Sequence, residues 1–294
     1  MDQAAELRVP PERMKSAPNP GQQIRVVSVT SGKGGVGKTN IVVNLAYALA
    51  MRGKRVMVLD ADVGLANVDI LLGLNPQYTI QHLLNGEKGL TDILVKGPGG
   101  ILILPASSGI QELAELTREQ RIHLLSAFET MDRKIDILVI DTGAGISSNV
   151  MYFNVAAHEI IVVVSPEPTS ITDAYALMKV MSLRYAEHHF NLLVNGAKDN
   201  IDADKVFEKL SMVAERFLNI SISYLGYIPY DNHVKKAVKQ QKIVMERYPE
   251  ATVSRSFHVL AEKFLKTSVP ITSNRGNIKF FWRQLFKRDD LEKR

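Results

Sequence analysis

Short apolar runs rich in β-branched residues alternate with longer segments of helical periodicity along most of the chain. Runs of this kind, apolar on both faces, are typical of strands in a parallel sheet that helices cover on both sides. We expect seven strands, at residues 24–29, 55–59, 101–104, 135–140, 159–164, 191–194 and 222–228, with helices between most of them. The pattern predicts an α/β fold, doubly wound around a mostly parallel sheet.

The two ends of the chain differ from this body. Residues 1–23 are polar and proline-rich, which predicts a flexible arm, and residues 269–276 have the composition of a linker. One domain is therefore expected over residues 24–268, followed by a tail at 277–294. The start of the chain lacks the apolar core of a signal sequence, and no run reaches the length of a membrane span, so we expect a cytoplasmic protein.

The tail carries its own pattern. A single helical stripe, with spacings i, i+3, i+4, i+7 and i+8, is formed by Ile278, Phe281, Trp282, Leu285 and Phe286. Basic residues lie elsewhere around the same helix. A short basic amphipathic helix with Trp and Phe on its apolar side is typical of peripheral attachment to an anionic membrane. The alternative is a terminal helix packed on the domain.

Composition bounds the size of the domain and excludes several kinds of site. A chain of 294 residues with 46% hydrophobic and 23% charged content can bury the core of one enzyme-sized domain. It contains no cysteine, which excludes disulfides, thiolate metal sites and iron–sulfur clusters. Residues 275–294 hold seven basic and three acidic side chains, so +4 of the formal +5 belongs to the tail and about +1 to the rest. Direct nucleic-acid binding is not expected from so weakly charged a body.

Residues 31–39 read S-G-K-G-G-V-G-K-T and satisfy the phosphate-binding pattern G-x-x-x-x-G-K-[ST] between a predicted strand and a predicted helix. In this pattern backbone amides surround the phosphates, Lys38 reaches the terminal phosphates and the Thr39 hydroxyl binds Mg²⁺. The nucleotide-binding residues expected here are Gly32, Lys33, Gly34, Gly35, Val36, Gly37, Lys38, Thr39 and Asn40.

The same glycines match the dinucleotide pattern G-x-G-x-x-G, with Asp60 where a ribose would be held. That alternative leaves no role for Lys38 and Thr39. The acidic residues Asp60, Asp62 and Asp141 follow two predicted strands, at the edge where a doubly wound sheet binds its ligand. We therefore favour a nucleoside triphosphate.

Lys33 makes the loop K-G-G-V-G-K-T, which resembles the deviant Walker A motif of the MinD/ParA ATPases, and the resemblance extends through nearly the whole chain. It implies a slow, Mg²⁺-dependent ATP hydrolase that forms a homodimer around two ATP molecules. Lys33 would reach the partner's nucleotide, Lys38 its own, and Asp62 would orient the attacking water. Thr39, Asp60 and Asp141 would serve the metal.

Members of this family bind adenine with an asparagine at the end of one of the last strands of the sheet and with a loop that comes later in the chain. Asn195 and Pro229 are the corresponding residues. Here Asn195 precedes Gly196 and Ala197 rather than the frequent arginine, so the stacking on the base differs from the family pattern.

Three further segments resemble one subgroup, the FlhG/FleN (YlxH) regulators of flagellar number. They are the arm motif D-Q-A-x-x-L-R, residues 141–147 and residues 167–177. The resemblance implies that Asp2, Gln3, Leu7 and Arg8 contact the SRP-type GTPase FlhF and stimulate it, with Gln3 offered to its active site. It also implies a flagellar transcription activator or a basal-body switch component as further partners, and an ATP-bound dimer on the inner membrane. A MinD-like division-site ATPase or another ParA-type positioning ATPase is the alternative.

Overall fold

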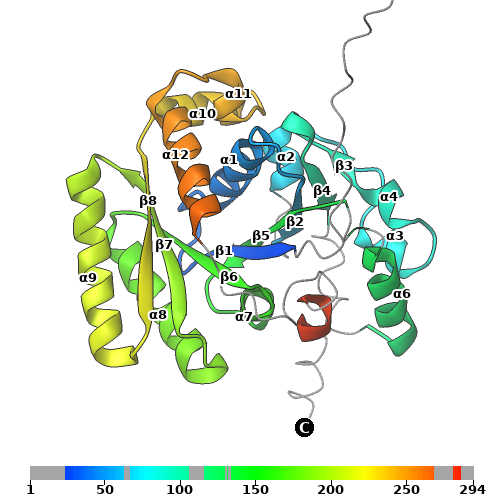
Figure 1. The fold of residues 1–294 in the computed structure, drawn as a ribbon, viewed down its shortest axis with the longest axis horizontal. Helices are drawn as coiled ribbons and strands as arrows, with labels where there is room; N and C mark the ends of the chain where they lie inside the picture. The colour runs from blue at the N-terminus through cyan, green and yellow to red at the C-terminus, as the bar shows by residue number, and fades with distance from the viewer. Residues whose placement is uncertain are drawn as a thin grey trace, which may run out of the picture.

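The computed structural model describes residues 24–62, 67–105, 116–129, 131, 134–267 and 281–285. Within these residues one mixed sheet is flanked by helices on both faces (Figure 1). Its strands are β1 (Arg25–Ser31), β2 (Val56–Ala61), β3 (Val95–Lys96), β4 (Leu102–Pro105), β5 (Ile137–Ala144), β6 (Glu159–Val164), β7 (His189–Ala197) and β8 (Ser221–Pro229). The doubly wound α/β fold predicted from the sequence is confirmed.

The helices fall between the strands and after them. They are α1 (Lys38–Ala50), α2 (Val68–Leu72), α3 (Ile80–Leu84), α4 (Leu90–Ile93), η1 (Pro98–Gly100), α6 (Arg118–Glu129), α7 (Ser148–Ala156), α8 (Pro168–Tyr185), α9 (Asn200–Leu218), α10 (Asn232–Lys239), α11 (Val244–Arg247) and α12 (Thr252–Lys266). Residues 281–285 add a short helical segment near the end of the chain.

The strands lie in the order β3-β4-β2-β5-β1-β6-β7-β8, and all neighbours are parallel except the pair β3–β4. All seven strands expected from the sequence are present, with ends shifted by up to four residues. The sequence did not predict β3, because a strand of two residues carries too short a pattern. Both faces of the central strands β2 and β6 are buried throughout, which explains their continuous apolar runs.

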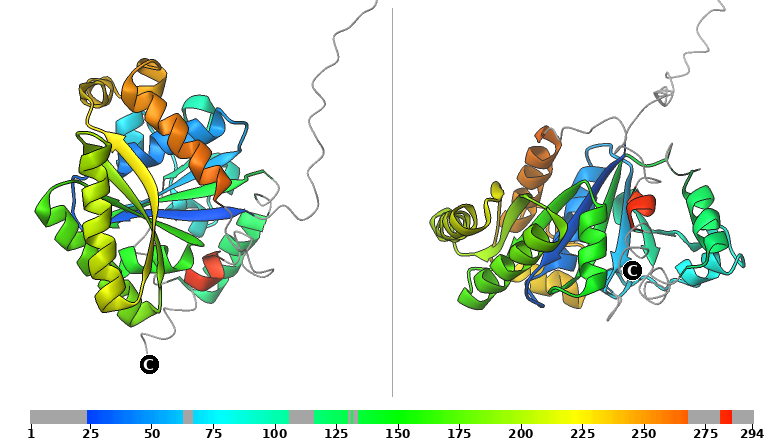
Figure 2. Two further views of the ribbon diagram at one scale, coloured as in Figure 1. Left: turned by 60° about the vertical axis from the view of Figure 1, so that its left-hand side comes forward. Right: turned by 90° about the horizontal axis from the view of Figure 1, so that it is seen from below.

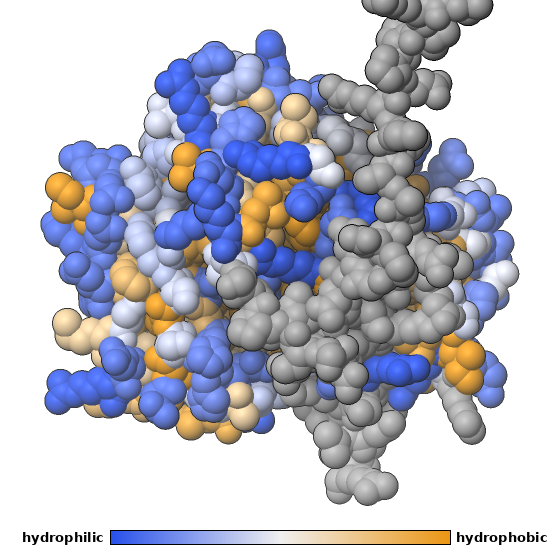
Figure 3. All heavy atoms as spheres, viewed as in Figure 1, coloured by the Kyte–Doolittle hydropathy of each residue, from blue (hydrophilic) through white to orange (hydrophobic). Residues whose placement is uncertain are grey.

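Helices bury the two faces of the sheet in separate layers (Figures 1 and 2). Side chains of α1, α10, α11 and α12 pack on one face. The other face is covered by α3, α4, α6 and α7 around β2 and β5, and by α7, α8 and α9 around β6 and β7. Figure 3 shows apolar patches scattered among polar ones on one face of the molecule. Exposed apolar side chains on α8 and α9 include Leu183, Met212 and Phe217.

The helical segment 281–285 packs against α6 and α7. Phe281 and Trp282 have no exposed surface, and Leu285 is buried as well. The ring of Trp282 lies 4.8 Å from that of Phe128 on α6, and the ring of Phe281 lies 6.4 Å from that of Phe153 on α7. In this structure Phe281, Trp282 and Leu285 are thus part of the core on that face of the sheet.

The parallel strands all end at one edge, and that edge gathers the polar residues singled out in the sequence. The loop after β1 lies between the ends of β5 and β6, its two neighbours in the sheet. Asp60 of β2 is paired in register with Asp141 of β5. The fold therefore builds a candidate site around the central loop, as expected of a doubly wound sheet.

Candidate functional site

The loop between β1 and α1 has the conformation of a phosphate cradle. Gly37 caps α1 with φ of 91°, a left-handed conformation that favours glycine. A side chain at Gly37 would also lie 2.5 Å from the Asn195 amide nitrogen. Lys38, the first residue of α1, is buried, and the hydroxyl of Ser31 donates to the carbonyl of Lys33 at 2.7 Å. The helix N-terminus above the loop offers unpaired amides to an anion.

The start of the loop touches α8. A Cβ atom at Gly32 would lie 2.1 Å from the backbone carbonyl carbon and oxygen of Asp173. Real Cβ atoms do not approach other atoms so closely, so this glycine is required for packing between the loop and α8. The sequence suggested only a phosphate-binding role for Gly32.

Asp141 lies within the central strand β5, and its carboxyl group is buried. Burial raises its pKa to about 7, although the neighbouring Thr39 hydroxyl and the Lys38 ammonium act in the opposite direction. Neither oxygen makes a hydrogen bond of good geometry, so the contact with the Thr39 hydroxyl leaves most of the hydrogen-bonding capacity of this carboxyl group unused. A buried carboxylate of this kind, close to a threonine hydroxyl, fits Mg²⁺, which keeps several waters and needs few protein ligands.

Asp60 lies next to Asp141 but serves a second purpose. Its carboxylate accepts hydrogen bonds from the backbone amides of Asn67 and Val68 at 3.2 Å each, at the start of α2. Burial raises the pKa of Asp60 to about 6, although these amides oppose the shift. Asp60 therefore ties the start of α2 to the carboxyl end of β2, a role that the sequence did not reveal.

Asp62 faces the carboxyl end of β5. A Cβ atom at Gly143 would lie 3.4 Å from one Asp62 carboxylate oxygen, and the Asn67 amide donates to the other oxygen at 3.4 Å. The hydroxyl of Thr142 donates to the carbonyl of Val29 at 3.1 Å and fixes this segment to β1. The structure thus brings the predicted water-orienting residue next to residues 142–143, in the segment 141–147 that resembles the FlhG/FleN subgroup.

Lys33 turns away from the cradle of its own loop. Its ammonium group donates to the Glu167 carboxylate at 2.7 Å and to the Thr169 hydroxyl at 2.9 Å. Both partners lie at the start of α8. Sequence reasoning noted residues 167–177 only as a subgroup match and did not connect them with Lys33, because nothing local in the sequence indicates a contact across 134 residues.

The two residues expected at adenine are adjacent on the last two strands. Pro229 of β8 pairs in register with Ala197 of β7, next to Asn195. The Asn195 amide donates to the carbonyl of Val36 at 2.7 Å and so contacts the phosphate loop. Their placement beside the loop agrees with a base-binding role, which stays a prediction.

Several predicted residues lie outside the described part of the chain. These are the arm residues Asp2, Gln3, Leu7 and Arg8 and the tail residues Ile278 and Phe286. Of the predicted membrane stripe, the described residues Phe281, Trp282 and Leu285 face protein in this structure rather than an open surface. Periodicity identifies the apolar side of a helix but does not distinguish lipid from a protein core.

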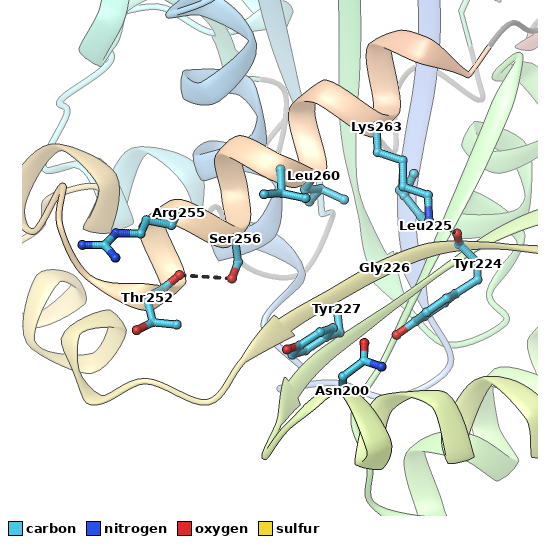
Figure 4. A pocket seen from close by; sticks show the side chains of 11 residues that line it. Asn200, Tyr224, Leu225, Gly226, Tyr227, Thr252, Arg255, Ser256, Leu260 and Lys263 are labelled. Carbon is cyan, nitrogen blue, oxygen red and sulfur yellow. Dashed lines mark hydrogen bonds between the residues drawn. The ribbon is translucent and has the colours of Figure 1, made fainter.

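A separate cavity of about 400 Å³ lies between β8 and α12 (Figure 4). Tyr224 and Tyr227 on β8 and Ser256 on α12 line it, and Lys263 donates to the carbonyl of Tyr224 at 2.7 Å. None of the predicted nucleotide-binding residues lines this cavity. Lys263 closes part of the open edge of β8, which is a structural role.

The sequence of this chain is similar to those of known proteins over most of its length. A family described as "AAA domain" matches residues 24–193. The antiactivator FleN of Pseudomonas aeruginosa is 46% identical over 263 residues, which cover 89% of this chain and 93% of that protein. The chain belongs to the FleN-like branch of the MinD/ParA ATPases. The flagellum site-determining protein YlxH of Helicobacter pylori, another member, is 34% identical over 238 residues, covering 81% of this chain and 80% of its own.

Solved structures of this ATPase family share the fold. The MinC:MinD cell division protein complex of Aquifex aeolicus contains a chain with a TM-score of 0.66 and 25% identity, covering 84% of this chain and 98% of that one. The MinD protein of Pyrococcus horikoshii, solved with Mg-ADP, has a TM-score of 0.64 and 25% identity over 83% of this chain and 96% of its own. Among the relatives found by sequence, the septum site-determining protein MinD of Buchnera aphidicola is 30% identical over 272 residues, a lower identity than that of FleN.

Proposed function

We propose that this protein is a Mg²⁺-dependent ATPase that dimerises on ATP, attaches to the inner membrane in that state and regulates the number and placement of flagella. The observation that carries the proposal is the grouping of Lys38, Asp62 and Asp141 around one phosphate loop, in a chain 46% identical to an antiactivator called FleN. The similarity to FleN and to the flagellum site-determining protein YlxH supports the flagellar assignment over a role in division.

The residues divide the chemistry between them. Lys38 and the amides of the loop hold the phosphates, Thr39 and Asp141 hold the metal, and Asp62 orients the attacking water. Mg²⁺, when bound, neutralises charge on the transferring phosphoryl group. Because phosphoryl transfer needs mainly positioning and electrostatic stabilisation, these groups are sufficient. Lys33 completes the site from the second protomer, which makes hydrolysis depend on dimerisation.

The tail supplies the membrane contact. No helix in the described part of the chain is long and apolar enough to cross a membrane, so attachment is peripheral. Because the stripe residues Phe281 and Trp282 are buried against α6 and α7, attachment requires their release. We propose that ATP-driven dimerisation releases two tails together, and their combined affinity then holds the dimer on an anionic surface.

The arm supplies the contact with a second nucleotide hydrolase. Residues 1–8, with Gln3 offered to the active site, stimulate an SRP-type GTPase of the FlhF kind. A chain lacking residues 1–8 should keep its own ATP hydrolysis and lose the stimulation of GTP hydrolysis by that partner. Equal stimulation by the truncated and full-length chains would place the activator elsewhere. A flagellar transcription activator and a basal-body switch component are the further partners proposed.

A deletion strain tests the whole proposal. Flagella are counted by electron microscopy in the deletion strain and after complementation with the native chain or with Asp62→Ala. The proposal predicts abnormal flagellar number in the deletion strain, normal cell length, and no rescue by Asp62→Ala. Normal flagellation with misplaced division septa would instead support a MinD-like division-site function.

A further inference from the structure

The lysine that gives the phosphate loop its deviant sequence is engaged within its own protomer. Lys33 donates to Glu167 at 2.7 Å and to Thr169 at 2.9 Å, so its ammonium group has two oxygen partners at the start of α8. The side chain of Lys33 is 36% exposed and that of Glu167 is 63% exposed. The contact is therefore accessible and can open without disturbing the core.

The backbone on both sides of this contact is fixed. On the loop side, Gly32 packs directly on the backbone of Asp173, and the Ser31 hydroxyl binds the carbonyl of Lys33. On the helix side, the buried hydroxyl of Ser170 accepts a hydrogen bond from the amide of Ser165 at 3.0 Å, which shapes the turn that leads into α8. Lys33 and its two partners are thus placed together by rigid elements rather than by a chance meeting of long side chains.

We propose that Glu167 and Thr169 are positioning residues that hold Lys33 within its own protomer and thereby set the affinity of the ATP dimer. The inference rests on the proposed function, in which Lys33 reaches the nucleotide of the partner protomer. One ammonium group cannot satisfy Glu167 and a phosphate on the opposite protomer in the same position. Each protomer therefore has to release its lysine before the dimer closes, and the carboxylate of Glu167 competes with the partner's phosphates.

The size of the effect follows from the exposure of the pair. Exposed ion pairs change an equilibrium by a factor of about one to five. A dimer releases two such lysines, so the factors multiply to at most about 25-fold in the dissociation constant. Salt weakens exposed pairs, so the difference between the native chain and a variant without the pair should shrink as ionic strength rises.

The test uses the full chain carrying Asp62→Ala, in which ATP is bound but not consumed. Analytical ultracentrifugation with Mg²⁺ and ATP gives the dissociation constant of the dimer. Adding Glu167→Gln should lower that constant several-fold, Thr169→Val should lower it less, and Glu167→Asp should restore most of the native value. The affinity of the monomer for ADP should stay unchanged, because in the proposed dimer the Lys33 side chain reaches the nucleotide of the partner protomer.

Glu250→Gln is the matched control. It removes a second exposed ion pair, between Glu250 and Arg255, whose side chains are 88% and 69% exposed. The control should leave the dissociation constant unchanged, and equal melting temperatures of all variants would show that the fold is intact. If Asp62→Ala dimerises but adding Glu167→Gln leaves the dissociation constant of the dimer unchanged or raises it, the inference is wrong. The proposed function is not affected by that result. If Asp62→Ala stays monomeric with Mg²⁺ and ATP, the proposed function fails first.

Discussion

Trp282 packs against Phe128, with ring centroids 4.8 Å apart, so the segment 281–285 lies on α6 of its own domain. Each large apolar side chain contributes at most about 1.5–3 kcal/mol on full burial. Ordering a short segment opposes this gain by about 1–2 kcal/mol per residue. The seated tail is therefore held by a small net free energy that a change in the domain can overcome. Trp282 is the only tryptophan in the chain, which makes it a reporter of this contact.

Phe281→Glu should release the tail without nucleotide. The substitution places a carboxylate beside Phe153, in a position with no exposed surface, and the desolvation of an unpaired charge outweighs the remaining contacts. The expected result is a red-shifted Trp282 emission, together with weaker binding to anionic vesicles because the stripe now carries a charge. Arg283→Gln is the control, because Arg283 is exposed on the same segment. It should reduce vesicle binding and leave the emission unchanged.

Asp62→Ala should separate ATP binding from hydrolysis. The phosphate loop is intact in this variant, while the carboxylate beside Gly143 is lost. We expect ATP turnover to fall at least about tenfold and ATP-bound dimers to accumulate, measured by phosphate release and by ultracentrifugation. Undiminished turnover would remove Asp62 from the reaction.

Gly32→Ala and Gly34→Ala form a matched pair within the loop. A Cβ at Gly32 would meet the backbone of Asp173 at 2.1 Å, whereas one at Gly34 would meet nothing within 4 Å. Gly32→Ala should therefore lower the free energy of unfolding by about 1–3 kcal/mol, as overpacked sites do, and displace the loop from α8. Gly34→Ala should leave the melting temperature of the nucleotide-free chain unchanged. Equal thermal stability of the two variants would contradict the packing role of Gly32.

Asp141→Asn should stabilise the nucleotide-free protein at neutral pH. Burial raises the pKa of Asp141 from 3.8 to about 7, so the folded chain holds this proton more tightly than the unfolded chain. The contribution of Asp141 to stability then falls as pH rises from about 4 to about 7 and is constant above that range. The asparagine variant should have a higher melting temperature at pH 7.5 and a weaker dependence on pH, with Mg²⁺-dependent hydrolysis lost.

Asp136→Asn is a control that should change the melting temperature in the opposite direction. Burial alone would raise the pKa of Asp136, but hydrogen bonds from Arg55 outweigh it and lower the pKa. This carboxylate contributes stability above its unfolded pKa and loses the contribution as the pH falls through its folded pKa. Asp136→Asn should therefore lower the melting temperature at pH 7.5. A drop in melting temperature for both variants would contradict the account of Asp141.

The sequence predicted those features that depend on local pattern. The apolar run Glu159–Val164 became β6 with the predicted ends, and Lys38 and Thr39 lie at the helix start that their motif requires. Contacts between distant segments were not predictable. Nothing near Lys33 indicates that Glu167 receives it, and nothing near Asn195 indicates that it binds the carbonyl of Val36. Such pairs depend on strand order, which places the ends of β6 and β7 beside the loop only after the sheet has formed.

The tail shows the same limit. The stripe through Phe281 and Trp282 predicts the apolar side of a helix but not the surface that it covers, because a protein core and a lipid surface both select apolar side chains. Burial on the domain and attachment to a membrane are two states of the same segment if nucleotide binding controls its release from the domain.

Acrylamide quenching of Trp282 tests the central claim most directly. Emission is measured in the full chain carrying Asp62→Ala, without vesicles, before and after addition of Mg²⁺ and ATP, and dimer formation is followed in the same samples. The account predicts a protected tryptophan in the nucleotide-free monomer and a quencher-accessible one in the ATP-bound dimer, with Mg-ADP leaving it protected. A tryptophan that stays protected in a sample shown to be dimeric would contradict release of the tail by ATP.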